Sequence, residues 1–298
     1  MKHTLKEWIA TTRYWSFSVS ALPAVAAIAY FCFRNGLHNI DWLSALLAVI
    51  GVVLFHAAGN LLSDVGDFRS GADSREACAI PNLVEHIFEP KQYLCLSAGL
   101  FALGIAIGLF LTWRCGWELL IIGGAGFIFT LLYTKSKNHW MSDLNVFVIF
   151  GALILIGTGF VVTHSIQWSA LLLTPPIGLI TLSVLHANNT VDIQTDGAAG
   201  LHTVAMALGI KKSARLYIAY QIIPFAWVVI CVIFGWLPWT ALLCMVSFLI
   251  AFGNIRQAST YRTRGREAMM GLDLRSAKLQ LIFSLTLSIG LFLAVFLQ

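Results

Sequence analysis

The sequence predicts an all-α membrane protein with nine membrane-spanning helices. Three observations predict this class. Only 11% of the 298 residues are charged and 58% are hydrophobic, whereas soluble domains carry about 25% charged residues. The apolar residues are gathered in runs of about 17 to 25, which is the length that a helix needs to cross a hydrocarbon core. The segments between these runs alternate between long, basic ones and short ones with little charge.

Each apolar run is predicted to be one spanning helix. In chain order the nine runs comprise residues 15–33, 42–62, 93–113, 117–133, 144–162, 170–187, 216–234, 236–252 and 279–297. The first run could instead be part of a cleaved signal peptide. It is too long for the apolar core of a signal peptide, and eight further runs follow, so we expect an uncleaved first helix.

The basic residues predict the orientation in the membrane. The long segments 63–92, 134–143, 188–215 and 253–278, together with the N-terminus, contain 17 of the 19 Lys and Arg residues, all but Arg34 and Arg114. Cytoplasmic segments carry such an excess. We therefore expect a multi-pass protein of the inner cell membrane, with its N-terminus in the cytoplasm and its C-terminus outside.

Composition argues against several other kinds of partner. The net charge of +5 is accounted for by basic cytoplasmic loops beside anionic lipid headgroups, so no nucleic acid is implied. The six cysteines show no spacing typical of a zinc site or a disulfide framework. No required protein partner is evident from the sequence.

Acidic residues gather on the same predicted face. Twelve of the 14 Asp and Glu residues lie there, the exceptions being Asp41 and Glu118. Two clusters follow the second and sixth runs, in HAAGNLLSDVGDFRSGAD (56–73) and HANNTVDIQTDGAAG (186–200). In both clusters Asn and Asp recur at spacings of three or four, which places side chains along one face of a helix.

The two clusters also indicate an internal repeat. Four helices separate them, so the chain is expected to be one domain, residues 1–298, built from two four-helix halves and a ninth helix. The first half comprises residues 13–143, the second residues 144–253, and the ninth helix residues 279–297.

The density of carboxylates predicts a metal site. Acids stacked near the C-terminal end of a helix repel one another and are disfavoured by the helix dipole, so a positive partner is expected. Carboxylates joined by amide oxygens suit Mg²⁺, which also binds substrate phosphates, and two such ions could bridge one diphosphate. The alternative is that the acids only mark the membrane surface.

A third cytoplasmic segment, YTKSKNHWMSD (133–143), carries Tyr133, Lys135 and Lys137. Opposite two metal-binding clusters, these side chains would bind the oxygens of a departing diphosphate. On their own, two lysines in a cytoplasmic loop only satisfy the charge rule for membrane proteins.

These motifs resemble the UbiA superfamily of intramembrane prenyltransferases across essentially the whole chain, and most closely the dihydroxynaphthoate prenyltransferases of menaquinone synthesis. The YxxxK motif of the family matches Tyr133 and Lys137, its GDxxVFxFFG motif resembles SDLNVFVIFG (142–151), and its opening motif is similar to RYWSFSVSALP (13–23). The first acidic motif, NxxNDxxDxxxGxD, is matched by Asn60, Asp64, Asp67, Gly71 and Asp73. The second acidic motif is matched by Asn188, Asn189, Asp192, Asp196, Gly200, Thr203, Leu208 and Gly209.

The chain departs from the family pattern mainly where the family has polar or basic residues. Ser63 replaces Asn, Val191 replaces Arg, Leu201 replaces Lys, Ala207 replaces Arg and Tyr14 replaces Pro. These departures leave the metal-binding acids in place and put the identity of the acceptor in doubt.

The resemblance implies Mg²⁺-dependent transfer of a polyprenyl group from polyprenyl diphosphate to 1,4-dihydroxy-2-naphthoate, with release of CO₂ and diphosphate. It implies metal binding by Asp64, Asp67, Asp192 and Asp196 with help from Asn60 and Asn189, and catalytic roles for Tyr133 and Lys137. The other expected substrate-binding residues are Asp73, Asn188, Arg69, Lys135 and Asp143. For His56 and His186, which sit before the two clusters, we expect hydrogen-bonded structural roles.

Two alternatives remain at this point. The same chemistry could act on another acceptor, of the hydroxybenzoate, homogentisate, haem or glycerol-phosphate type. A transporter or channel is less favoured, since its spans would carry polar residues near the bilayer midplane, and these spans are almost free of charge.

Overall fold

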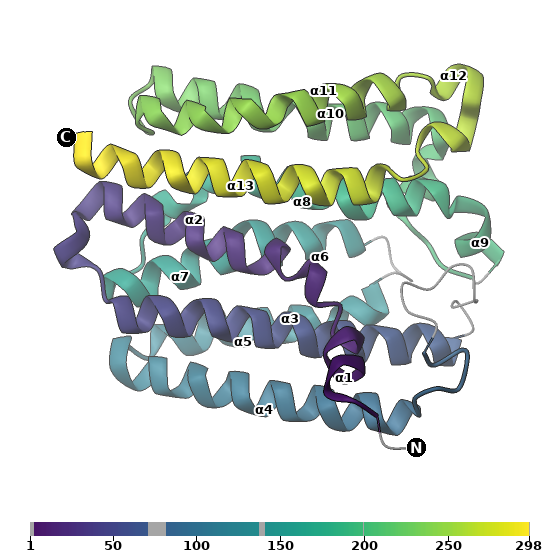
Figure 1. Ribbon diagram of the computed structural model, residues 1–298, viewed down its shortest axis with the longest axis horizontal. Coiled ribbons are helices and arrows are strands. Elements are labelled where there is room, and N and C mark those ends of the chain that lie inside the picture. Colours follow the sequence, from purple (N-terminus) through teal and green to yellow (C-terminus); the bar gives the residue numbers. More distant parts are fainter. Residues whose placement is uncertain (1–2, 71–81, 137–140, 199, 298) are drawn as a thin grey trace.

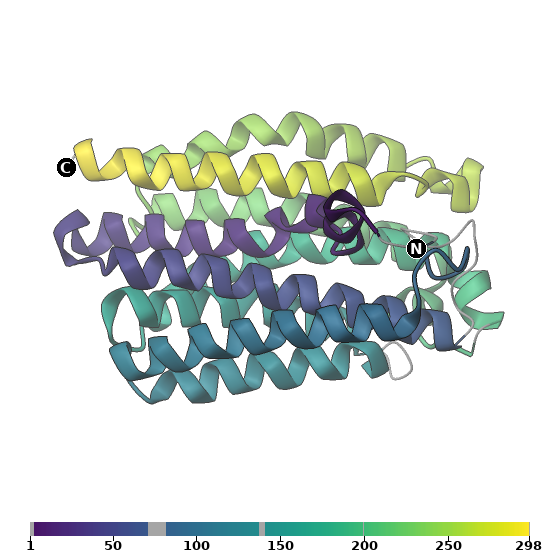
Figure 2. The same ribbon diagram turned by 60° about the horizontal axis from the view of Figure 1, so that its bottom comes forward.

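The structure is a computed structural model that describes residues 3–70, 82–136, 141–198 and 200–297. All regular secondary structure in these ranges is helical, which confirms the all-α class. The long helices lie side by side along the longest axis of the molecule (Figure 1), and a turned view keeps them in this arrangement (Figure 2).

The α-helices vary widely in length. They are α1 (Leu5–Thr11), α2 (Ser18–Asn35), α3 (Trp42–Ser70), α4 (Pro90–Cys115), α5 (Glu118–Ser136), α6 (Ser142–Val148), α7 (Ile154–Thr163), α8 (Thr174–Val191), α9 (Ile193–Ala198), α10 (Val204–Ile233), α11 (Phe248–Ala258), α12 (Tyr261–Arg264) and α13 (Leu272–Leu297). A π-helical turn, Ile149–Leu153, joins α6 to α7, and 3-10 turns cover Tyr14–Ser16, Leu37–Asn39, Trp168–Leu173, Trp239–Ser247 and Gly265–Ala268.

Eight helical segments of the described chain are long and apolar enough to cross a membrane. They are Tyr14–Asn35, Trp42–Arg69, Pro90–Cys115, Ser142–Thr163, Trp168–Val191, Val204–Ile233, Trp239–Ala268 and Leu272–Leu297. The predicted span 117–133 coincides with a shorter apolar helix, Glu118–Leu132. The count of nine spans therefore stays a prediction.

Two helices extend well beyond their predicted ends. Helix α3 continues to Ser70, and α10 begins at Val204, where the Thr203 hydroxyl accepts a hydrogen bond from the Met206 amide at 3.3 Å. Residues 63–70 and most of 204–215, which fall in the predicted connecting segments, are thus helical, and the second of these stretches is broken at Gly209, with φ of 67° and ψ of 163°. Hydropathy locates the apolar part of a helix, but backbone hydrogen bonding continues into polar residues where a cap supports it.

The main apolar core lies around α2, which is buried between other helices. Helix α2 packs against α3, α7 and α13, and α13 also packs against α8. Tyr30 and Phe31 of α2 are essentially fully buried. Gly159 allows α7 to approach closely, because a Cβ there would lie 2.6 Å from the Phe31 ring. The C-terminal helix thus contacts helices from both predicted halves, whose boundaries stay a prediction.

Candidate active site

A cavity of about 1030 Å³ lies among helices α3, α5, α7 and α8. Most of its wall is apolar and includes the aromatic rings of Phe55, Phe127 and Phe150. Polar side chains also line it: Arg13, Ser16, His56, Asn60, Ser63, Asp67, Asn188, Asn189, Asp192, Asp196 and Asp273. A largely apolar cavity with a limited polar set suits a substrate with a long hydrocarbon part and one charged group.

The first acidic cluster lies on α3, as its spacing predicts. Asn60 lines the cavity and donates from Nδ2 to the Thr12 carbonyl at 3.1 Å and to Ser16 Oγ at 3.2 Å. One turn further along, Ser63 Oγ donates to Asp67 Oδ2 at 3.5 Å, and both residues line the cavity. Asn60, Ser63 and Asp67 therefore share the face of α3 that borders the cavity.

Asp64 occupies a different position from its neighbours. It is only 4% exposed, is not among the residues that line the cavity, and forms a salt bridge with Arg13. Arg13 does line the cavity, and it adopts a left-handed backbone conformation with φ of 56°. Such a conformation is uncommon for a residue other than glycine.

The second acidic cluster follows a break in helix geometry. Helix α8 ends at Val191, Asp192 has φ of −94° and ψ of 10°, and α9 begins at the next residue. The regular helix is thus interrupted at Asp192. Backbone hydrogen bonds still run from the Asp192 amide to the Asn188 carbonyl at 3.0 Å and from the Asp196 amide to the Asp192 carbonyl at 2.8 Å. This continuity keeps Asn188, Asp192 and Asp196 on the same cavity.

The two clusters therefore border a single cavity. Asp67 and Asn60 come from α3, and Asn189, Asp192 and Asp196 come from the end of α8 and from α9. The two clusters together bring three carboxylates and several amide groups to it, although more than a hundred residues separate the two segments in sequence.

Asp143, expected to bind substrate, lies behind the cavity wall. It is 6% exposed and absent from the cavity lining, and its carboxylate accepts a hydrogen bond from Asn189 Nδ2 at 3.4 Å. Its other oxygen lies 3.3 Å from His186 Nδ1, and His186 Nε2 lies 2.9 Å from Ser213 Oγ. Asp143 thus holds Asn189, a residue that does line the cavity.

Both histidines have hydrogen-bond partners, as predicted. His186 is fully buried between Asp143 and Ser213. His56 lines the cavity, and its Nδ1 lies 3.0 Å from Ser20 Oγ.

The remaining predicted residues are only partly described. Asp73 and Lys137 fall outside the described residues, and the side chains of Tyr133 and Lys135, on the last turn of α5, also lie outside them. Arg69 is exposed in the last turn of α3 and is not among the residues that line the cavity.

Arg13 is the site residue that sequence reasoning missed. It precedes the first span and contributed to the resemblance only as the first letter of RYWSF. Its Nε is buried and has no hydrogen-bond partner in the described part of the chain. A contact between residues 51 positions apart leaves no periodic signal in the sequence.

The sequence model of the UbiA prenyltransferase family matches residues 11–296. The chain belongs to this family. The match covers both acidic clusters, so the residues around the cavity lie within the family's sequence pattern. The chain is a prenyltransferase, and the family resemblance inferred from its motifs is confirmed.

Among curated proteins, the UbiA prenyltransferase domain-containing protein 1 of Xenopus tropicalis is 31% identical over 237 residues, which is 75% of this chain and 66% of that protein. The mouse protein of the same name is 28% identical over 98% of this chain and 86% of its own length. The specific assignment to dihydroxynaphthoate prenyltransferases does not follow from these relatives.

Solved structures share the UbiA fold. A UbiA homologue from Aeropyrum pernix, in its apo form, superposes with a TM-score of 0.72 at 18% identity and covers 93% of this chain and 97% of its own. A homologue from Archaeoglobus fulgidus, bound to geranyl diphosphate (GPP) and Mg²⁺, gives a TM-score of 0.62 at 13% identity, with 96% and 98% covered. Mg²⁺ and a prenyl diphosphate thus bind together in a UbiA protein.

Proposed function

We propose that this UbiA prenyltransferase transfers a polyprenyl group from polyprenyl diphosphate to an aromatic quinone precursor, with Mg²⁺ as cofactor. The observation that carries the proposal is that both acidic clusters line one largely apolar cavity. The polar end suits the diphosphate and its ions, and the apolar wall suits the prenyl chain and the aromatic ring.

The donor atoms fit Mg²⁺. Asp67, Asp192 and Asp196 bring carboxylates to the cavity, and carboxylate oxygens are what this hard cation prefers. Asn60 and Asn189 each use the amide nitrogen to donate within the protein. Their amide oxygens are thereby left for a cation. We assign Asp64 a supporting role through Arg13.

Arg13 is proposed to bind the diphosphate. It lines the cavity, and its side chain is 27% exposed. A guanidinium group offers planar, paired donors that match phosphate oxygens. Tyr133, Lys135 and Lys137 are proposed to contribute further donors, as the family motif implies.

The reaction begins when the allylic C–O bond of the substrate breaks, giving a carbocation and diphosphate. Bound Mg²⁺ supplies positive charge that stabilises the diphosphate oxygens. Arg13 orients the diphosphate. Phe55, Phe127 and Phe150 line the apolar wall of the cavity, which protects the carbocation from water. Aromatic faces also stabilise a nearby cation.

The electron pair of a ring carbon then forms the new C–C bond. With 1,4-dihydroxy-2-naphthoate, the carbon that is substituted loses its carboxylate as CO₂, so no ring proton has to be removed. With an acceptor that lacks this carboxylate, the ring proton is lost to a base. The proposed acceptor class rests on the motif pattern. The departures from that pattern bear on this choice, because Leu201 lines the cavity at the position where the family has a lysine.

The proposed orientation places the polar end of the cavity at the cytoplasmic face of the inner cell membrane, with the N-terminus inside and the C-terminus outside. The distribution of Lys and Arg residues supports this placement.

The test is an assay of purified protein in detergent with Mg²⁺, a long-chain prenyl diphosphate and separate acceptors of the naphthoate, hydroxybenzoate, homogentisate, haem and glycerol-phosphate types. We expect prenylated product and CO₂ with the dihydroxynaphthoate only. If another acceptor is turned over and the naphthoate is not, the proposed acceptor is wrong and the proposed reaction class stands.

A further inference from the structure

The end of the bundle opposite the acidic clusters contains a second group of polar residues. Asp41 immediately precedes α3, whereas Asp67 lies near the other end of the same helix. At a rise of 1.5 Å per residue, the two are separated by about 40 Å along the helix. This group is therefore independent of the prenyl transfer site.

Three chain segments bring this group together. Asp41 comes from the connection between α2 and α3, Cys115 is the last residue of α4, and His164 follows α7. The Asp41 amide donates to the Val162 carbonyl at 3.2 Å, and Cys115 Sγ lies 3.6 Å from the Val161 carbonyl. The end of α7 thus holds both neighbours in place.

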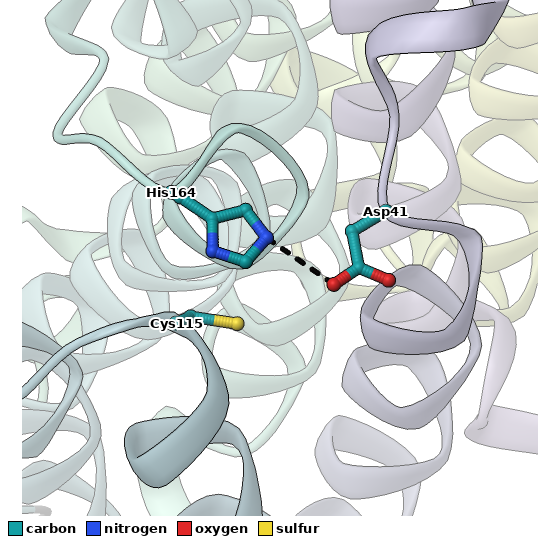
Figure 3. Close-up of side chains that lie close together, drawn as sticks. All are labelled: Asp41, Cys115 and His164. Atoms are coloured by element: carbon teal, nitrogen blue, oxygen red, sulfur yellow. Dashed lines mark hydrogen bonds and ion pairs between the residues drawn. The ribbon is translucent and has the colours of Figure 1, made fainter.

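His164 is turned toward Asp41 by its backbone. It has a left-handed conformation, with φ of 55° and ψ of 27°, and its amide donates to the Phe160 carbonyl at 2.8 Å. The His164 ring faces the Asp41 carboxylate, with Cys115 beside them, in Figure 3.

The three side chains offer ligand atoms at metal-binding separations. His164 Nε2 and Asp41 Oδ2 lie 3.2 Å apart, and these atoms and Cys115 Sγ all lie within 4.8 Å of one another. Ligands around a tetrahedral ion such as Zn²⁺ are about 3.4–3.6 Å apart. The His–Asp separation is slightly shorter than this spacing, and the thiol sulfur lies within 4.8 Å of both atoms.

Hydrogen-bond donors surround the Asp41 carboxylate. Burial on its own raises the pKa of the Asp41 carboxyl group, but hydrogen bonds from Arg114 and Ser44 outweigh this effect and hold the pKa well below its usual range.

Arg114 and Ser44 act as orienting partners of the carboxylate. Arg114 donates from Nε to Asp41 Oδ2 at 2.8 Å and from Nη2 to Oδ1 at 3.2 Å, and Ser44 Oγ donates to Oδ2 at 2.8 Å. Such contacts to a ligating carboxylate are usual around metal sites. An ion here would replace the contact between His164 and Asp41 and the contact of the Cys115 thiol to the Val161 carbonyl.

We propose that Asp41, Cys115 and His164 form a second metal site, for Zn²⁺ or a similar divalent transition ion. Sulfur, imidazole and carboxylate ligands together favour this class of ion and disfavour Mg²⁺. Binding releases the Cys115 thiol proton to solvent and forms one bond from each side chain, while water takes the fourth position. The ion enters past His164, whose side chain is 42% exposed.

The metal would tie together the ends of α3, α4 and α7. Asp41, Cys115 and His164 have no regular spacing, so no sequence pattern indicates this site. The site is a structural one and does not depend on which acceptor the enzyme uses.

The test is a Co²⁺ titration of the full chain in detergent after removal of metals. A thiolate ligand gives a sulfur-to-cobalt charge-transfer absorption that carboxylate sites, including the Mg²⁺ site, do not give. We expect this band in the wild type, saturating at one ion per chain and lost when Zn²⁺ is added. Cys95, an exposed residue on the same helix, provides the matched control.

In Cys115→Ser the band should be absent, and in Cys95→Ser it should be unchanged. His164→Ala, which alters an exposed side chain, should weaken Co²⁺ binding at least tenfold and keep the fold. Prenyl transfer with Mg²⁺ should persist in both site variants, which separates this proposal from the proposed function. A wild type without the band, or a band that persists in Cys115→Ser, overturns the site.

Discussion

Arg13 forms a salt bridge with Asp64, a partner 51 residues away on α3. The pair joins the segment before the first span to the first acidic cluster. Asp64 is almost fully buried, whereas the Arg13 side chain is 27% exposed and reaches the cavity. The guanidinium therefore links a buried acid of the motif to the space where the diphosphate is expected.

Replacing Arg13 tests this link. Arg13→Ala leaves the Asp64 charge buried without this partner, which costs about 1–3 kcal/mol of unfolding free energy, and it removes a diphosphate ligand. We expect kcat/KM for the prenyl diphosphate to fall about 100-fold. Thermal unfolding and steady-state kinetics measure the two effects. The control is Arg34→Ala, at an exposed basic residue in the last turn of α2. If the two variants have the same kcat/KM and the same unfolding temperature, Arg13 does not have the proposed role.

The cavity-lining acids are expected to act in catalysis and not in folding. Asp67→Asn and Asp192→Asn keep size and hydrogen-bonding capacity but remove a charge from the proposed metal ligands, so prenyl transfer should fall at least about 100-fold. Unfolding temperatures should stay close to that of the wild type. Glu267→Gln, at a side chain 70% exposed, serves as control. Full activity of both Asp variants would remove the metal site from the mechanism.

Asp143 is expected to position Asn189 and not to touch substrate. Asp143→Asn disturbs the contacts to His186 Nδ1 and to Asn189 Nδ2. Because such outer partners alter metal affinity by about 10- to 100-fold, the Mg²⁺ concentration for half-maximal activity should rise by this factor. The KM for the acceptor should change little.

The control for Asp143→Asn is Ser183→Ala on α8, which removes a buried hydroxyl that accepts from Gln221 Nε2 at 2.9 Å. This variant should lower stability without changing the Mg²⁺ requirement. If Asp143→Asn raises the KM for the acceptor and leaves the Mg²⁺ dependence unchanged, Asp143 contacts the substrate, as the sequence analysis expected.

The Asp41–Arg114 pair predicts a pH dependence of stability. The pKa of Asp41 lies below its usual range in the folded protein, so its contribution is fully present above the usual value of about 3.9 and is lost as the pH falls below it. Asp41→Asn should therefore lower the unfolding temperature at pH 7 in the presence of EDTA. The difference from the wild type should shrink below about pH 4. A difference that does not change with pH would exclude an ionic contribution.

The sequence by itself determined the all-helical class of the protein, the apolar segments of its long helices and its family. Apolar length and the spacing of Asn60, Asp64 and Asp67 on one helix are local properties, which a short stretch of chain expresses directly. The family pattern could be recognised for the same reason, since each of its motifs is a short run of neighbouring residues.

Tertiary structure alone decided which side chains meet. It buried Asp64 against Arg13, placed Asp143 behind Asn189, and joined Asp41, Cys115 and His164 at the opposite end of the bundle. It also broke the helix at Asp192. Helix packing sets which face of each helix borders the cavity, and contacts between distant segments have no period in the sequence, so these relationships could not be read from it.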